Sequence, residues 1–183
     1  FYRFEAFLLD PSAEKLSAFK AGIRNELPHE TYLSLARRYL DLGHPETALR
    51  VLREAPQTPV VLIWQAALDR ENQDGFISKA SEASPELAFP HRLETAGFLE
   101  QLLPADGSWK LHYYLGLVYW HLGRMEEAGE QFNLCGDRPD YAPFYLAKAR
   151  LFAADEALVE SCLDRARQLG PEVAGIELPE RLD

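Results

Sequence analysis

Apolar residues recur at three- and four-residue intervals along most of the chain, which is the periodicity of an amphipathic α-helix. The stretches at 33–40 and 111–122 both show this spacing clearly. β-branched residues are sparse, and no sustained alternation of apolar and polar residues indicates a strand. The pattern therefore predicts an all-α fold.

Residues that commonly begin or end helices separate these periodic stretches. Glycine adopts the left-handed conformation that often follows a helix, proline suits a first helical turn, and serine caps the free N–H groups there. The expected helix ends are Gly43, Gly123 and Gly136, the first-turn prolines are Pro45 and Pro59, and the N-caps are Ser12 and Ser108.

These signals predict about ten helices joined by short connections, so consecutive helices should pack as antiparallel hairpins. The stretches 72–75, 84–90 and 104–107 are expected to be loops. The predicted helices are 12–26, 29–42, 45–55, 59–70, 74–84, 91–103, 108–122, 124–136, 141–153 and 155–169.

Two segments of the chain share one pattern of small, aromatic and apolar residues. Each of seven positions in the first segment recurs 80 residues later in the second. A coincidence would have to extend over two helices and the turn between them. The paired positions are Leu35 with Leu115, Ala36 with Gly116, Tyr39 with Tyr119, Gly43 with Gly123, Ala48 with Ala128, Leu52 with Phe132, and Ala55 with Cys135.

This pattern resembles the tetratricopeptide repeat, a helix–turn–helix unit of about 34 residues. The resemblance implies a right-handed α–α superhelix, a solenoid built from antiparallel helix pairs. Small residues would let the two helices of a unit approach closely, and the tyrosine would fill the groove between helices.

The resemblance also implies that residues 1–183 form a single repeat domain with six parts. In the last repeat, Leu163 and Ala166 take the packing positions. The parts are an N-terminal capping helix at 1–28, a clear repeat at 29–58, a degenerate repeat with an insertion at 59–107, a clear repeat at 108–140, a degenerate repeat at 141–171 and a tail at 172–183.

Three segments, at 23–32, 89–95 and 135–145, resemble the repeat region of certain large bacterial proteins. In those proteins the repeats resemble an appendage to an upstream β-sandwich similar to galactose mutarotases, of no assigned activity. The resemblance implies that this chain is the helical part of a longer protein. The first residue, which is Phe1 and not Met, agrees with that expectation. An accessory role beside a carbohydrate-active enzyme is one consequence.

In tetratricopeptide proteins the first helix of each unit lines the concave surface, which usually binds a peptide or a helix. The resemblance therefore implies a groove for a protein partner or for an upstream domain of the same protein, with aromatic and Arg side chains as anchors. The alternative is that Tyr113 and Trp120 pack against a neighbouring helix or the C-terminal tail. The expected contacts are Lys110, Tyr113, Leu117, Trp120 and His121 in one repeat, and Leu33, Arg37 and Leu40 in the other.

Residues 89–92 interrupt the repeat where the extra residues fall. They combine an aromatic ring, a proline and two side chains that can donate hydrogen bonds. They form either a contact loop or a buried link between two halves of the solenoid.

The charge balance narrows the class of partner. The formal net charge is −10, from 29 acidic and 19 basic side chains, and such a surface repels nucleic acid and anionic lipid. No apolar run approaches the ~20 residues that span a membrane, and no signal segment begins the chain. Cys135 and Cys162 have no disulfide or metal-ligand pattern, so we expect buried, reduced thiols and a cytoplasmic protein.

Catalysis has little support in the sequence. None of the five histidines makes an i, i+4 pair with another, and no metal-binding motif or Gly-rich phosphate loop is present. We expect no catalytic residue, no cofactor and no metal. The main prediction is a protein-interaction or domain-docking scaffold, and the alternative is a homodimer formed by exposed terminal helices.

Overall fold

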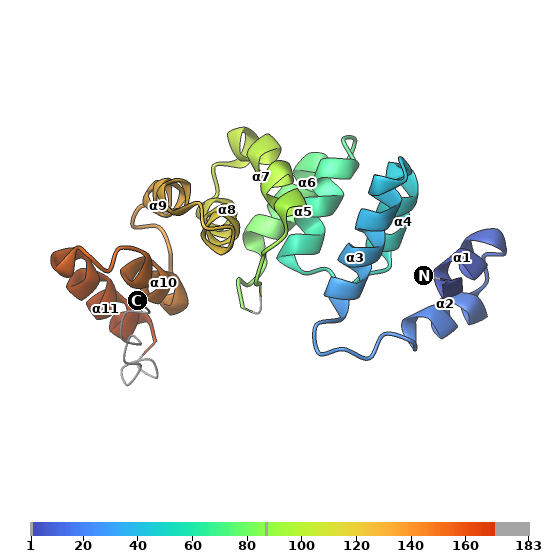
Figure 1. The fold of residues 1–183 in the computed structure, drawn as a ribbon, viewed down its shortest axis with the longest axis horizontal. Helices are drawn as coiled ribbons and strands as arrows, with labels where there is room; N and C mark the ends of the chain where they lie inside the picture. The colour runs from blue at the N-terminus through green and yellow to red at the C-terminus, as the bar shows by residue number, and fades with distance from the viewer. Residues whose placement is uncertain (1, 87, 171–183) are drawn as a thin grey trace. The chain divides into compact units, whose positions relative to one another are not determined.

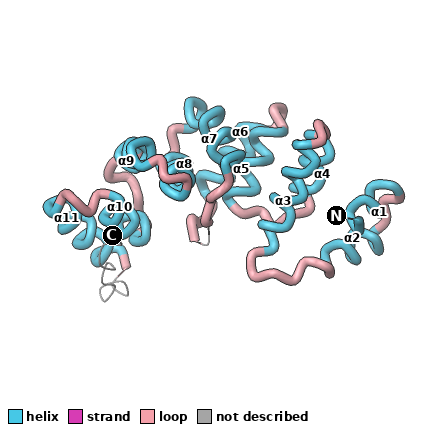
Figure 2. Tube along the Cα trace, in the orientation of Figure 1, coloured by secondary structure: helices cyan, strands magenta, loops and turns pink. Residues whose placement is uncertain are grey.

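The computed structural model describes residues 2–86 and 88–170. All regular secondary structure in those ranges is α-helical, which confirms the all-α prediction (Figures 1 and 2). The chain divides into two compact units, Phe1–Phe76 and Ile77–Asp183, and each is described by itself. None of the helices that the structure describes is long and apolar enough to cross a membrane.

The first unit consists of consecutive helix pairs. Phe4 and Phe19 join the first pair, with ring centroids 5.0 Å apart. The hydroxyl group of Tyr39, in the third helix, donates to a carboxylate oxygen of Glu5 in the first helix. The helices are α1 (Tyr2–Leu9), α2 (Ala13–Lys20), α3 (Pro28–Asp41), α4 (Pro45–Arg53) and α5 (Pro59–Leu68); α6 (Gln73–Glu82) contains the boundary with the second unit.

The second unit adds a single helix and two further pairs, which Figure 1 shows from green to red. A cluster of aromatic rings forms its core. Phe132 and Phe144 stack with centroids 5.3 Å apart, and both side chains are fully buried. The helices are α7 (Leu93–Asp106), α8 (Trp109–His121), α9 (Met125–Leu134), α10 (Ala142–Leu151) and α11 (Glu156–Leu169).

The turns of the two clear repeats have the same hydrogen-bond pattern. After α3, Gly43 has φ 77° and its N–H donates to Leu40 O, while the N–H of His44 donates to Tyr39 O at 2.8 Å. This two-bond arrangement satisfies carbonyl groups that a helix end would leave unpaired. The equivalent bonds after α8 are Gly123 to Trp120 O and Arg124 to Tyr119 O, with φ 75° at Gly123.

The paired small residues lie where the helices approach most closely. Gly116 in α8 faces α9, and a Cβ atom placed on it would lie 2.7 Å from Cδ2 of Phe132. At the equivalent positions of the first unit, Ala36 and Leu52 are both fully buried. The repeat with the larger residue on its second helix, Phe132, therefore has the smaller residue on its first helix, Gly116.

Several predicted boundaries differ from the structure. The sequence predicted one helix at 12–26, whereas the structure has α2 ending at Lys20 and a separate helix, α1, that was not predicted. The stretch 104–107 was predicted as a loop, but α7 continues to Asp106 and ends at Gly107 with φ 62°. The stretch 72–75 lies mostly in the first turn of α6. The predicted tail at 172–183 lies outside the described residues.

Candidate interaction surface

Lys110 positions the start of the connection between α6 and α7. Its ammonium group donates to Glu82 O at 3.2 Å and to Ala83 O at 2.7 Å. These carbonyl groups are at the C-terminal end of α6, where a positive charge is favourable. Lys110, predicted as a groove contact, therefore caps a helix in this structure.

His121 contacts the other end of the same connection, residues 83–92. The imidazole rings of His121 and His91 have centroids 5.7 Å apart and meet edge to face. Because Lys110 and His121 are eleven residues apart, they lie on one side of α8, and Leu117 lies between them. The connection is therefore held beside α8 at both of its ends.

The middle of the connection is partly buried. Ala88 and Pro90 are buried, whereas the side chain of Phe89 is 62% exposed and that of Leu93, the first residue of α7, is 64% exposed. Glu86, in the connection, also affects Tyr141. Burial first, and then the negative charge of Glu86, raise the pKa of the Tyr141 hydroxyl group. Residues 89–92 therefore include a buried residue, Pro90, and an exposed aromatic side chain, Phe89.

Tyr113 belongs to the core of the second unit. It is 6% exposed, and its ring lies against Phe132 of α9 and Phe144 of α10, with centroids 5.6 and 5.4 Å away. Burial raises its pKa. Trp120 is half-buried, with its ring 6.3 Å from that of Phe132. Both aromatic side chains therefore pack on a neighbouring helix, and Trp120 also remains partly accessible.

The three predicted contacts in the first unit differ in accessibility. Leu33 is fully buried, Leu40 is half-buried and Arg37 is exposed. The Nε atom of Arg37 lies 3.6 Å from a carboxylate oxygen of Asp41, one turn further along α3. Of these three predicted contacts, Arg37 and part of Leu40 are accessible to a partner, whereas Leu33 is not.

Both cysteines are buried, as predicted, and neither forms a disulfide bond. Burial raises the pKa of Cys135 to about 12, and it also raises the pKa of Cys162. A thiol with a raised pKa is rarely in the thiolate form that reacts or binds metal. Within residues 2–86 and 88–170, no group of three or more His, Cys, Asp or Glu side chains could hold a metal ion.

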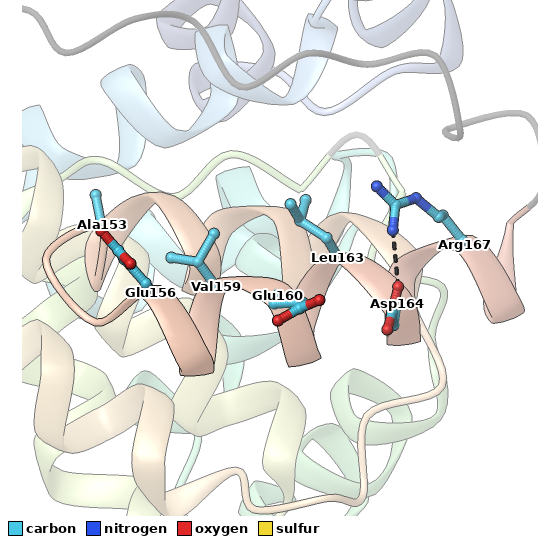
Figure 3. A pocket seen from close by; sticks show the side chains of 7 residues that line it. All are labelled: Ala153, Glu156, Val159, Glu160, Leu163, Asp164 and Arg167. Atoms are coloured by element: carbon cyan, nitrogen blue, oxygen red, sulfur yellow. Dashed lines mark hydrogen bonds and ion pairs between the residues drawn. The ribbon is translucent and has the colours of Figure 1, made fainter.

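A second surface feature, which the sequence did not predict, lies on α11. A shallow groove of about 300 Å³ follows this helix (Figure 3). Half-buried apolar side chains and acidic side chains line it together. The lining residues are Ala153, Glu156, Val159, Glu160, Leu163, Asp164 and Arg167.

One segment of the chain matches a known repeat family. The tetratricopeptide repeat model matches residues 29–54, which are α3, α4 and the turn between them. This part of the chain is therefore a repeat of that type. No curated protein matches the chain. The matches give no support to the resemblance to proteins with a galactose mutarotase-like domain.

Three similar solved structures are those of MamA proteins. "MamA RS-1 ArsTM double mutant" is 18% identical over 79% of this chain and 95% of its own, with a TM-score of 0.41. "MamA 41-end from Desulfovibrio magneticus RS-1" is 17% identical over 81% and 97%, with a TM-score of 0.36. "Crystal structure of MamA protein" is 15% identical over 98% and 92%, with a TM-score of 0.39.

Proposed function

We propose that the chain is a non-catalytic scaffold that binds a peptide or an adjoining domain through its second unit. The observation that carries this proposal is the connection at 83–92, which Lys110 and His121 hold beside α8 while Phe89 and Leu93 stay largely exposed. Exposed apolar side chains on a positioned segment are typical anchors for a partner, because they bury area at little cost in conformational entropy.

The proposed contact surface, called the α8 surface below, contains five residues. Leu33 and Tyr113 are not part of it because they are buried, and Lys110 is not part of it because its ammonium group donates to Ala83 O. The net charge of −10 favours a neutral or basic segment over nucleic acid. The α8 surface consists of Phe89, Leu93, Leu117, Trp120 and His121.

Affinity capture with the full chain tests the proposal. The test variant is Phe89→Ser/Leu93→Ser. The control is Met125→Ser/Leu134→Ser on α9, whose side chains are similarly exposed at 53% and 55%. Circular dichroism should show that both variants fold. We expect proteins that the wild type and the control capture from lysate to be lost with the test variant, as quantified by mass spectrometry.

Two results would contradict the proposed α8 surface. The first is capture of the same proteins by all three forms, which would place the contact elsewhere. The second is the absence of any protein enriched over empty resin, which would remove the evidence for a partner in that lysate.

Homo-oligomerisation is the second candidate function, and α1 supports it. Tyr2 and Leu9 of α1 are among the most exposed large apolar side chains of the chain. A two-fold contact between copies would bury them. Sedimentation equilibrium at several concentrations should then show a dimer for the wild type and a monomer for Leu9→Glu. A monomer for both would contradict this candidate.

A further inference from the structure

The groove on α11 has an apolar base and an acidic rim. Figure 3 shows Val159 and Leu163 following each other along the helix, and both are half-buried. Asp164 is already paired with Arg167 at 2.7 Å. Glu156 and Glu160 are exposed, and neither has an ion-pair partner within residues 2–86 and 88–170.

The apolar base of the groove corresponds to a position that is covered elsewhere in the chain. Leu163 follows Phe132 by 31 residues, and Ala166 follows Cys135 by the same 31. In α9, the ring of Phe132 is stacked on Phe144 of the next helix and is fully buried. Leu163 has the equivalent position in α11 but remains half-exposed.

The first unit shows the same relation between a second helix and the helix that follows it. Leu52 in α4 is fully buried, and its carbonyl oxygen accepts a hydrogen bond of 2.9 Å from the side chain of Gln65 in α5. The side of α11 that carries Val159 and Leu163 is therefore the side on which this fold packs its next helix.

We propose that this groove, the α11 groove, binds an amphipathic helix of a partner protein with Lys or Arg beside its apolar stripe. Val159 and Leu163 are one turn apart, so they match apolar residues at i and i+4 of a partner helix. Glu156 and Glu160 form a parallel acidic row, which pairs with basic residues flanking that stripe. This proposal concerns a surface separate from the α8 surface, and either one can fail without the other.

Charge disfavours two other occupants. In a two-fold contact between copies, the same acidic rows would meet across the axis. Residues 171–183 contain four acidic residues and one basic residue, so they too would place negative charge against the rim. The four acidic residues are Glu172, Glu177, Glu180 and Asp183.

Two synthetic helical peptides of about 20 residues test the proposal against the full chain. They share one apolar stripe at i, i+4 spacing and differ only in having Lys or Glu beside it. Fluorescence anisotropy measures their binding to the wild type, to Glu156→Lys/Glu160→Lys and to the control Glu126→Lys/Glu130→Lys. The control makes the same charge change at exposed positions of α9.

We expect the wild type and the control to bind the Lys peptide in preference to the Glu peptide. Charge reversal on α11 should weaken binding of the Lys peptide about tenfold or more and reverse the preference. Leu163→Ala, with an unchanged circular dichroism spectrum, should weaken binding of both peptides.

Three results would overturn the proposal. One is no binding of the Lys peptide to the wild type. Another is an equal loss in the α11 variant and the control, which would show a general charge effect. The third is a wild-type dimer that Leu163→Glu dissociates, because the occupant would then be a second copy.

Discussion

Two buried tyrosines of the second unit differ in whether the hydroxyl group has a partner. The hydroxyl of Tyr145 donates to Pro139 O at 3.0 Å. The hydroxyl of Tyr114 is buried and has no hydrogen-bond partner within the described residues. A buried polar group without a partner is destabilising, and removal of a satisfied one leaves its partner unpaired.

Replacing each tyrosine by phenylalanine should therefore have opposite effects. We expect Tyr114→Phe to raise the free energy of unfolding by about 1 kcal/mol and Tyr145→Phe to lower it by about 1 kcal/mol. Urea denaturation followed by circular dichroism measures both. A loss of stability in both variants would show that the Tyr114 hydroxyl has a partner after all.

Tyr119 makes stability depend on pH. Burial first, and then the hydrogen bond of 2.6 Å that its hydroxyl donates to Glu100, raise its pKa from 10.0 to about 12. The stability that this raised pKa contributes is fully present below pH 10, the pKa of Tyr119 in the unfolded chain. It is lost as the pH rises towards about 12, the pKa of Tyr119 in the folded chain.

Urea denaturation at pH values from about 9 to 12 measures this contribution. The wild type should lose stability above pH 10, and Tyr119→Phe should lose it less steeply because this ionisation is gone. Equal slopes for the two proteins would mean that Tyr119 ionises alike in the folded and unfolded chains.

At the scale of the helix pair, Gly116 and Phe132 set how closely α8 and α9 pack. A methyl group on Gly116 would lie 2.7 Å from the Phe132 ring, which is held by its stack on Phe144. Overpacking costs about 1–3 kcal/mol, more than the gain of about 1 kcal/mol in helix propensity. Gly116→Ala should therefore lower the free energy of unfolding by about 1 kcal/mol.

The first unit suggests the compensating change, because it has Ala36 and Leu52 at the equivalent positions. In Gly116→Ala/Phe132→Leu, the measured loss should be smaller than the sum of the two single losses. Gly97→Ala is the control: Gly97 lies inside α7, and apart from the adjacent backbone of that helix no atom lies within 4 Å of the added Cβ, so the substitution should be neutral or stabilising. Additive losses in the double variant would contradict the close-packing explanation.

The sequence predicted the helix pairs well because their signals are local. The paired residues around Gly43 and Gly123 set the caps and turns within a few positions of the chain. Helix α1 was missed because Tyr2–Leu9 is shorter than the window of about 11 residues over which helical periodicity is recognised, although Phe4, Phe7 and Leu8 follow the helical spacing. The loop predicted from Pro104 was wrong, because a proline removes one N–H donor without preventing a final helical turn.

The candidate site was less predictable because it depends on distant parts of the chain. Periodicity placed Tyr113 on one side of α8, but only the packing of α10 shows that Phe144 covers it. The connection at 83–92 has no period, so the exposure of Phe89 and Leu93 follows from how Lys110 and His121 hold its ends. Leu93 gave no signal in the sequence that would have separated it from a core residue.

At the scale of the whole molecule, each compact unit has its own buried core. Tyr39 and Leu52 belong to the first, whereas Phe132 and Phe144 belong to the second. In repeat proteins, stability is close to a sum of terms for each repeat and for its contacts with neighbours. A substitution that destabilises one unit should therefore act first within that unit.

Hydrogen exchange measured by mass spectrometry tests this expectation with Gly116→Ala. Peptides from α8 and α9 should exchange faster than in the wild type, because overpacking favours local opening of that pair. Peptides from α3 and α4, which have a separate core, should exchange at the wild-type rate. A uniform increase across both units would instead mean that the chain opens as one cooperative body, and the cost of Gly116→Ala would then be shared by the repeat at 29–54.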